Sequence, residues 1–223
     1  MKLYHGSENI IEKPVYGYGK KYNDYGVGFY CTEDIGMARE WAVDIDRDGY
    51  ANCYELDVTG LSILNLCDRE YTILHWLAVL LQNRTFHIPS PLAEEARQYI
   101  IEKFLVNYEN YDIIKGYRAD DSYFSFAQDF INGVISYRQL CTAMYLGELG
   151  EQLVLKSKPA FEQICFVGSE PVNKDEWYAK KAFRDKKARR EYFDVEKNKR
   201  QKGDLYIMQI MDEEMRADDL RLR

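Results

Sequence analysis

Three short segments of the chain carry residue types that could bind and activate a polar ligand. Residues 4–7 read Tyr-His-Gly-Ser, residues 26–30 read Gly-Val-Gly-Phe-Tyr, and residues 151–155 read Glu-Gln-Leu-Val-Leu. A histidine ring offers a donor and an acceptor, glycine lets a backbone approach a ligand without a Cβ, and tyrosine presents a flat ring with a polar tip. Each segment is common by itself, so only the three together, in this order, indicate a ligand-binding site.

Each of the three segments adjoins a predicted strand, which would hold its side chains in place. Strands are expected near 2–5, 28–32, 51–56, 112–119, 152–157 and 163–168. Helices are expected after Thr32, which can cap the first of them, and over 68–82, 93–108, 121–132 and 136–146, where apolar residues recur at helical spacing. The sequence therefore predicts an α+β fold with helices inserted at about 68–110 and 121–146.

The composition of the chain changes after Pro171. Residues 180–202 contain eleven Lys or Arg against four Asp or Glu, and residues 204–219 are acidic. We therefore expect residues 1–171 to form the main domain and residues 172–223 to form a helical, charged C-terminal extension docked on it. A free interaction arm, or a segment that contacts nucleic-acid phosphates, is the alternative.

The bulk composition narrows the class of protein. Apolar residues make up 46% of the 223-residue chain, enough for a real core, and the net charge of −7 argues against a surface built for nucleic acid. The five cysteines include no CxxC pair and the three histidines lie far apart, so neither a disulfide framework nor a metal site is expected. No apolar run approaches the roughly 20 residues of a membrane helix. We expect a soluble, cytoplasmic protein without a metal.

In order and spacing, the three segments resemble the diphtheria-toxin-like branch of the ADP-ribosyltransferases, which includes the poly(ADP-ribose) polymerases. That branch has a histidine-glycine pair on its first strand, a G-x-G-[IF]-Y strand entry, a second aromatic residue about eleven residues later, and a catalytic glutamate that begins a late strand. The counterparts here are His5-Gly6, residues 26–30, Trp41 and Gln152. The resemblance implies an ADP-ribosyltransferase-like split antiparallel β core around a cleft for NAD+, which serves as substrate.

A closer resemblance is to the bacterial DUF3990 family, whose domains have no assigned function and are placed in the same superfamily. Its members open with LYHGS, continue through GFY-x-T and a helix bearing WA, and contain GYxADD and QxVxKS segments, all of which are present here. The sequence RD-x-x-AR at 184–189 extends the likeness into the tail. Genes of this family often stand beside small partner genes, which implies a toxin–antitoxin-like arrangement with a small antitoxin protein as partner.

The resemblance also implies a role for each matching residue. His5 would hydrogen-bond the adenosine-side ribose, and Gly6 would bond the nicotinamide amide through its backbone. Tyr30 and Trp41 would stack on the nicotinamide ring. The residue at position 152 would bond the ribose 2′-hydroxyl and support the positive charge that develops as the glycosidic bond breaks. The expected catalytic residues are Gln152, His5 and Tyr30, and the further NAD+-binding residues are Ser7, Gly28, Phe29, Thr32 and Asp120.

Position 152 departs from the family pattern, because Gln152 is an amide and supplies no negative charge. It can still bond a ribose hydroxyl, so the change disfavours chain elongation and leaves transfer of a single ADP-ribose. Glu151 is adjacent, but side chains alternate along a strand, so it should face away if Gln152 faces the cleft. Glu148, on the preceding loop, is the other substitute.

Each candidate also has a purely structural interpretation. His5 could be a hydrogen-bonded histidine at a strand end, Tyr30 and Trp41 could be core aromatics, and Asp120 could cap the helix that follows. His75 and His87 are interpreted as structural.

We expect an NAD+-dependent mono-ADP-ribosyltransferase, in the manner of a bacterial toxin or effector, that modifies an unidentified protein or nucleic acid and has no membrane partner. The alternative function is a catalytically weak or inactive module that binds NAD+, ADP-ribose or a partner protein.

Overall fold

The computed structural model describes residues 1–119, 121–144, 150–193 and 200–223. None of the described helices is both long enough and apolar enough to cross a membrane. The elements, in chain order, are β1 (Lys2–Ser7), β2 (Phe29–Cys31), α1 (Ile35–Ala42), β3 (Gly49–Leu56), β4 (Ile63–Asn65), α2 (Ile73–Asn83), α3 (Pro91–Phe104), η1 (Tyr108–Asn110), β5 (Ile113–Tyr117), α4 (Asp121–Ile131), α5 (Tyr137–Ala143), β6 (Glu151–Leu155), α6 (Lys158–Glu162), β7 (Ile164–Val172), α7 (Lys174–Glu191), α8 (Ile207–Asp212) and η4 (Leu220–Leu222).

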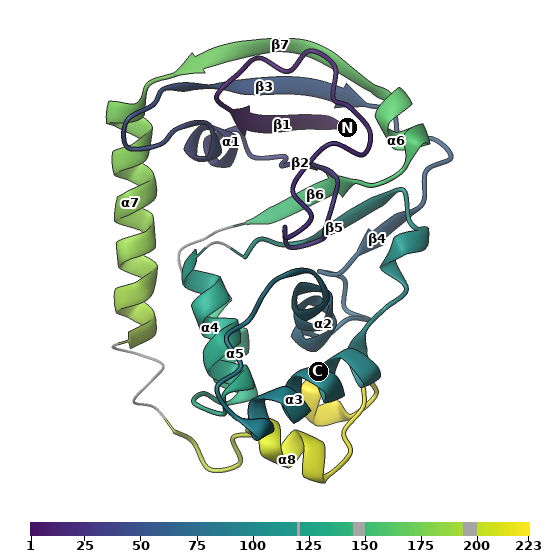
Figure 1. Cartoon of the computed structure of the whole chain (residues 1–223), viewed down its shortest axis with the longest axis vertical. Coiled ribbons are helices and arrows are strands. Elements are labelled where there is room, and N and C mark those ends of the chain that lie inside the picture. Colours follow the sequence, from purple (N-terminus) through teal and green to yellow (C-terminus); the bar gives the residue numbers. More distant parts are fainter. Residues whose placement is uncertain (120, 145–149, 194–199) are drawn as a thin grey trace.

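Two small β-sheets make up the upper part of the molecule as drawn in Figure 1. Sheet A has the strand order β1-β3-β7 and sheet B has the order β2-β6-β5-β4. Every pair is antiparallel except β4 with β5. The edge strands β1 and β2 are joined by one bridge, in which the N–H groups of Tyr4 and Thr32 donate to each other's carbonyl oxygens at 2.8 and 2.9 Å. The chain is therefore an α+β protein, as the sequence predicts, and its strands form two mostly antiparallel sheets.

A small apolar core fills the space between the two sheets. Leu3 of β1 meets Phe29 of β2 and Leu153 of β6 there, and all three are buried. Because side chains alternate along a strand, the neighbouring Tyr30 and Gln152 face the opposite side of sheet B. β2 and β6 therefore present one face to the inter-sheet core and the other to the helices.

Helix α1 lies directly against β1, and a glycine allows this approach. A Cβ at Gly6 would come within 1.9 Å of the carbonyl oxygen of Ala38 and 2.7 Å of the Cβ of Trp41. No side chain fits in that space without moving α1, since real Cβ contacts of this length do not occur. Gly6 thus fixes how α1, and with it Trp41, sits beside β1.

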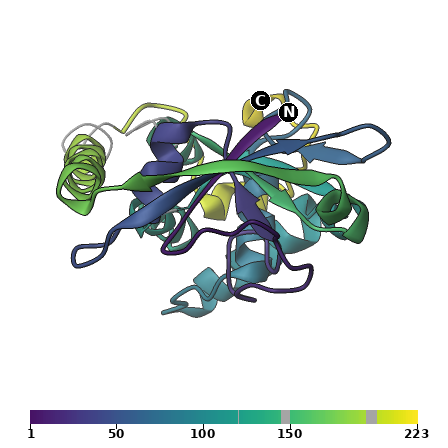
Figure 2. The same cartoon turned by 90° about the horizontal axis from the view of Figure 1, so that it is seen from above.

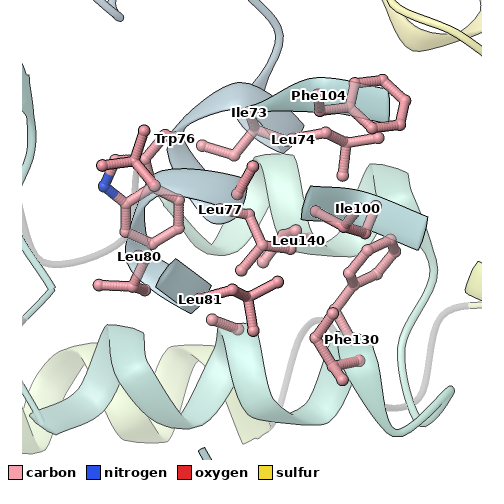
Figure 3. Close-up of a cluster of buried hydrophobic side chains, with 14 of the residues drawn as sticks. Ile73, Leu74, Trp76, Leu77, Leu80, Leu81, Ile100, Phe104, Phe130 and Leu140 are labelled. Atoms are coloured by element: carbon pink, nitrogen blue, oxygen red, sulfur yellow. The ribbon is translucent and has the colours of Figure 1, made fainter. Parts of the chain in front are cut away.

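The far face of sheet B is covered by helices α2 to α5 (Figure 1), which enclose the largest apolar core. All residues of α2 from Ile73 to Leu81 are buried. Figure 3 shows Leu77 and Leu81 directed at side chains of the surrounding helices, including Ile100 and Phe130. The helix begins at Ile73 rather than near residue 68, because residues 68–71 form a hydrogen-bonded turn before it.

The C-terminal extension packs on the rest of the chain at two places. Helix α7 continues from β7 at one edge of the molecule (Figure 2) and runs down beside it toward the helical layer (Figure 1). Arg184 of α7 pairs with Glu40 of α1 at 2.8 Å, and the Tyr192 ring stacks on Phe126 of α4 with centroids 3.8 Å apart. Helix α8 buries Ile207 and Ile210 in the helical core. The described part of the extension therefore contacts α1, α4 and the helical core.

Candidate functional site

A cleft of about 880 Å³ opens beside the bridge between β1 and β2. Its wall is formed by residues of β1, β2, β6, α1 and α7, by the residues that follow β5, and by the loop around residues 18–24. The volume lies in the range that small-molecule and cofactor sites occupy. Of the residues predicted from the sequence, those that line the cleft are His5, Gly28, Phe29, Tyr30, Trp41 and Gln152.

Two other predicted residues, Ser7 and Thr32, make structural contacts and do not line the cleft. The Ser7 hydroxyl donates to the carbonyl oxygen of Asn9 at 2.6 Å, which fastens the chain after β1. The buried Thr32 hydroxyl accepts from the N–H of Asp34 at 3.1 Å and donates to the carbonyl oxygen of Glu151 at 3.3 Å. Asp34, and not Thr32 as predicted, caps α1, because the Asp34 carboxylate accepts from the first free N–H groups of that helix.

The backbone N–H and C=O groups of Gly6 point to the edge of β1 that faces β2. The N–H and C=O groups of alternate residues in a strand point to the same edge. Tyr4 uses its groups to bond Thr32, which directly follows β2, so those of Gly6, two residues along, point to that same edge. The two remaining candidates, Asp120 and Glu148, lie outside the described residues.

His5 is held as a neutral ring with one nitrogen left to accept. Its Nδ1 lies 2.6 Å from the carbonyl oxygen of Tyr30, and a carbonyl only accepts, so Nδ1 carries the proton. Burial lowers the pKa of the imidazole, and the bond to Tyr30 opposes this shift only in part. The ring also packs on Phe29, with centroids 4.6 Å apart. The Nε2 lone pair of His5 is therefore suited to accept a hydrogen bond from a ligand hydroxyl.

Tyr30 and Lys156 together hold the glycine-rich loop at the cleft. The Tyr30 hydroxyl donates to the carbonyl oxygen of Gly26 at 2.7 Å and accepts from the N–H of Tyr25 at 3.0 Å. From the other side, the Lys156 ammonium donates to the carbonyl oxygens of Tyr25 and Val27 at 2.6 and 2.7 Å. The hydroxyl of Tyr30 is thus engaged by the loop, and its ring is what remains to face a ligand.

Gly28 is explained by packing within the protein. A Cβ there would lie 2.5 Å from a methyl group of Val154 and 2.8 Å from the carbonyl oxygen of Leu155. Close contact with β6 therefore accounts by itself for a glycine at this position.

Trp41 brings an aromatic face and a buried donor to the cleft. The guanidinium of Arg118 lies over its ring, 5.3 Å from the centroid. The indole Nε1 is buried and has no hydrogen-bond acceptor among the described residues. A buried donor without a partner costs free energy, so Trp41 would gain from a ligand that offers an acceptor.

Gln152 faces the cleft wall, where its amide bonds a carboxylate that the sequence analysis missed. Gln152 is 3% exposed, and its Nε2 donates to Asp24 Oδ2 at 2.9 Å and, at 3.3 Å, to the carbonyl oxygen of Tyr117. Asp24 also accepts from Arg84 and from the N–H of Ala119. Neither Asp24 nor Arg84 belongs to a recognisable motif, so only the fold brings them to Gln152.

Glu151 points away from the cleft, as the alternation of side chains along β6 predicts. Its carboxylate pairs with Lys115 of β5 at 2.6 Å and is 41% exposed. Lys115 also pairs with Glu33, at 3.2 Å. Glu151 therefore belongs to a surface charge cluster on the other face of the sheet and does not substitute for Gln152 at the cleft.

Positive charge prevails among the residues that line the cleft, although the whole chain carries −7. Lys20, Arg84, Arg118, Lys181 and Arg184 contribute cations, against the carboxylates of Asp24, Asp44 and Asp185. Such a lining favours a ligand with negative charge. Within the described residues, no group of three or more His, Cys, Asp or Glu side chains is placed to hold a metal ion.

Comparison with known proteins places the first three quarters of the chain in a family. The model of a family described as "Protein of unknown function (DUF3990)" matches residues 1–166. The match covers all three segments that contribute to the cleft and ends before α7, so the RD-x-x-AR sequence of the tail lies outside it. No curated protein and no solved structure matches the chain.

Proposed function

This chain belongs to the DUF3990 family, and we propose that it transfers a single ADP-ribose group from NAD+ to a macromolecular acceptor. The observation that carries the proposal is the meeting of His5, Tyr30 and Gln152 at one cleft, although they come from three different strands. These are the residues whose order in the sequence resembles that of the ADP-ribosyltransferases.

The chemistry of the cleft complements that of NAD+. His5 Nε2 can accept from a ribose hydroxyl, and the Gly6 backbone offers one donor and one acceptor to the primary amide of nicotinamide. The rings of Tyr30 and Trp41 offer flat faces to an aromatic ring. Cations such as Lys181 suit the pyrophosphate.

The reaction breaks the bond between nicotinamide N1 and ribose C1′, and the electron pair leaves with nicotinamide. An oxygen or nitrogen of the acceptor forms the new bond to C1′ and loses its proton. With water as acceptor, the products are ADP-ribose and nicotinamide. The ribose carries positive charge in the transition state, so groups that place negative charge or acceptor oxygens beside it accelerate the reaction.

A module that binds NAD+ or ADP-ribose with little turnover is the second candidate function. It is favoured by Gln152, which is uncharged, and by the ion pair that engages the Asp24 carboxylate with Arg84 at 3.0 Å. Both functions need the same cleft, so binding alone does not separate them.

The test is a single-turnover experiment with enzyme in excess over NAD+ labelled on nicotinamide or on adenylate. Transferase function predicts release of the nicotinamide label, with the adenylate label recovered in an acceptor or as ADP-ribose. A His5→Ala variant should lose this release, and a His87→Ala variant, altered at an exposed residue outside the cleft, should keep it. Saturable binding without nicotinamide release would support the second candidate, and no binding would contradict both.

A further inference from the structure

Asp24 is a buried carboxylate in the wall of the cleft, directly beside Gln152. It is 6% exposed. Its Oδ1 accepts from Arg84 Nη1 at 3.0 Å, and its Oδ2 accepts from the N–H of Ala119 and from Gln152 Nε2, both at 2.9 Å. Every one of these partners is a donor, which is the surrounding that an ionised carboxylate requires.

These contacts fix the direction in which the Gln152 amide presents its two ends. A carboxylate and a carbonyl oxygen only accept, so the NH2 group of Gln152 must face Asp24 and the carbonyl of Tyr117. The Oε1 atom is then the end of the amide left for a ligand. Position 152 therefore selects a ligand group that donates, such as a ribose hydroxyl, and disfavours one that only accepts.

The charge of Asp24 is balanced by groups from several elements. Arg84 pairs with it directly, and Arg118 attracts it from a greater distance. The phenols of Tyr25 and Tyr30 also lie close enough to interact with it, and remain neutral because burial raises their pKa. Burial raises the pKa of Asp24, while its three hydrogen bonds and the two arginines oppose that shift.

We propose that Asp24 and Gln152 act as one unit, in which Asp24 supplies the negative charge that an amide at position 152 lacks and Gln152 carries the contact to the ribose. This inference rests on the proposed function. Asp24 is a positioning residue, because it acts on the substrate through Gln152. Its charge polarises the amide, so that Oε1 becomes a stronger acceptor as C1′ turns positive.

In the step itself, nicotinamide leaves with the electron pair of the N1–C1′ bond and the acceptor oxygen attacks C1′. The proton of that acceptor passes to solvent. Neither Asp24 nor Gln152 gains or loses a proton, and no bond is made to either of them. Their contribution is electrostatic, and it is larger in the transition state than in the bound NAD+.

Exchanging the two side chains provides a test that a merely structural role would not pass. In Asp24→Asn, the amide oxygen can keep the bonds from Ala119 and Gln152 while the new NH2 group faces Arg84, so the negative charge is lost. In Gln152→Glu, two carboxylates face each other and share one proton over part of the pH range. In the double variant, an amide at 24 donates to a carboxylate at 152, which restores one hydrogen bond and one negative charge.

The measurement is NAD+ hydrolysis by the four full-length proteins, with water as acceptor and with kcat and KM determined between pH 5 and 9. We expect Asp24→Asn to lower kcat by about tenfold or more with little change in KM. Gln152→Glu should also be slower and should gain a new pH dependence from the shared proton. The double variant should recover most of the wild-type kcat. Thermal unfolding of the same four proteins shows which of them are folded at the temperature of the assay.

The possible results separate this inference from the proposed function. Wild-type turnover that Asp24→Asn leaves intact, or a double variant no better than the single variants, would overturn the role of Asp24 and leave the proposed function standing. A wild type that binds no NAD+ in calorimetry would overturn the proposed function and this role with it. If Asp24→Asn fails to fold, a double variant that folds and turns over supports the unit, and one that folds without turnover overturns it.

Discussion

The cleft and the helical core behind sheet B share a hydrogen-bond acceptor, the carbonyl oxygen of Tyr117. From the core, Trp76 Nε1 donates to that oxygen at 3.0 Å, and from the cleft Gln152 Nε2 donates to it at 3.3 Å. The core is built from apolar side chains of neighbouring helices. The cleft wall is a polar network, in which Asp24 bonds Arg84 and Gln152, 60 and 128 residues away in the sequence.

This difference shows where stability and ligand binding are separated in the molecule. Apolar burial stabilises the fold at roughly 25 cal/mol for each Å² removed from water. A buried charge such as Asp24 contributes little or nothing to stability after its desolvation. The polar network is therefore best understood as preparation for a ligand, and the helical core as the support that keeps it in place. Variants in the helical core should therefore change stability, and variants in the polar network should change ligand binding.

The largest expected effect is on stability, from Leu77→Ala in the core. Leu77 is fully buried in α2, so its removal leaves a cavity and should lower the free energy of unfolding by about 2–5 kcal/mol. Chemical denaturation measures this loss. NAD+ affinity, measured by calorimetry at a temperature where the variant is folded, should stay within about threefold of wild type. An affinity that falls together with stability would mean that the two regions are not separable.

Acid should lower the free energy of unfolding through two histidines, the buried His75 in the core and the partly buried His5 in the cleft. Burial lowers the pKa of both below the ordinary 6.5, so the unfolded chain binds protons more readily than the folded one. Their contribution is complete above that pH and is lost as the pH falls below it, by up to about 1.4 kcal/mol per pH unit for each histidine. The pKa of Asp24 is instead raised in the folded protein, so the folded protein takes up this proton more readily than the unfolded chain. Protonation of Asp24 therefore opposes the loss of stability in acid.

Changing His75 alone isolates the contribution of the core histidine to the pH dependence of stability. Denaturation between pH 8 and 5 should show a shallower dependence for His75→Gln than for wild type, with NAD+ affinity unchanged at pH 8. Equal pH dependence in the two proteins would show that His75 takes up its proton without unfolding.

A smaller loss of stability is expected when the ion pair between α1 and α7, beside the cleft, is broken. Glu40 and Arg184 are 13% and 18% exposed and bond at 2.8 Å, so Glu40→Gln should cost about 1 kcal/mol and loosen α7. Faster proteolysis between residues 174 and 191 would report this. Glu176→Gln, which removes an exposed pair with Lys180, is the matched control and should change little. Equal proteolysis of the two variants would contradict a docking role for Glu40.

Much of the fold was predictable because it follows from local pattern. The apolar run of α2 and the alternation of β3 each specify their element, and the structure differs from expectation mainly at the ends, as at Ile73. Strand β4 (Ile63–Asn65) was missed because three residues carry too short a pattern to recognise. Its pairing with β5 is a contact between distant segments.

The candidate site was predictable only where it lies on motifs. His5, Tyr30, Trp41 and Gln152 stand in recognisable segments, and the structure brings all four to the cleft. Asp24 stands in a loop of glycine, tyrosine and lysine without periodicity, and its role is defined by partners that only the folded chain supplies.

The most direct test of the central claim is calorimetric titration of NAD+ into the wild-type protein and into His5→Ala. His5 offers Nε2 to the ligand and takes little part in the apolar cores, so its loss should remove binding and leave the fold intact. We expect saturable binding by the wild type, weakened at least about tenfold in the variant. No binding by either protein would contradict an NAD+ cleft, and equal binding by both would place NAD+ somewhere other than against His5.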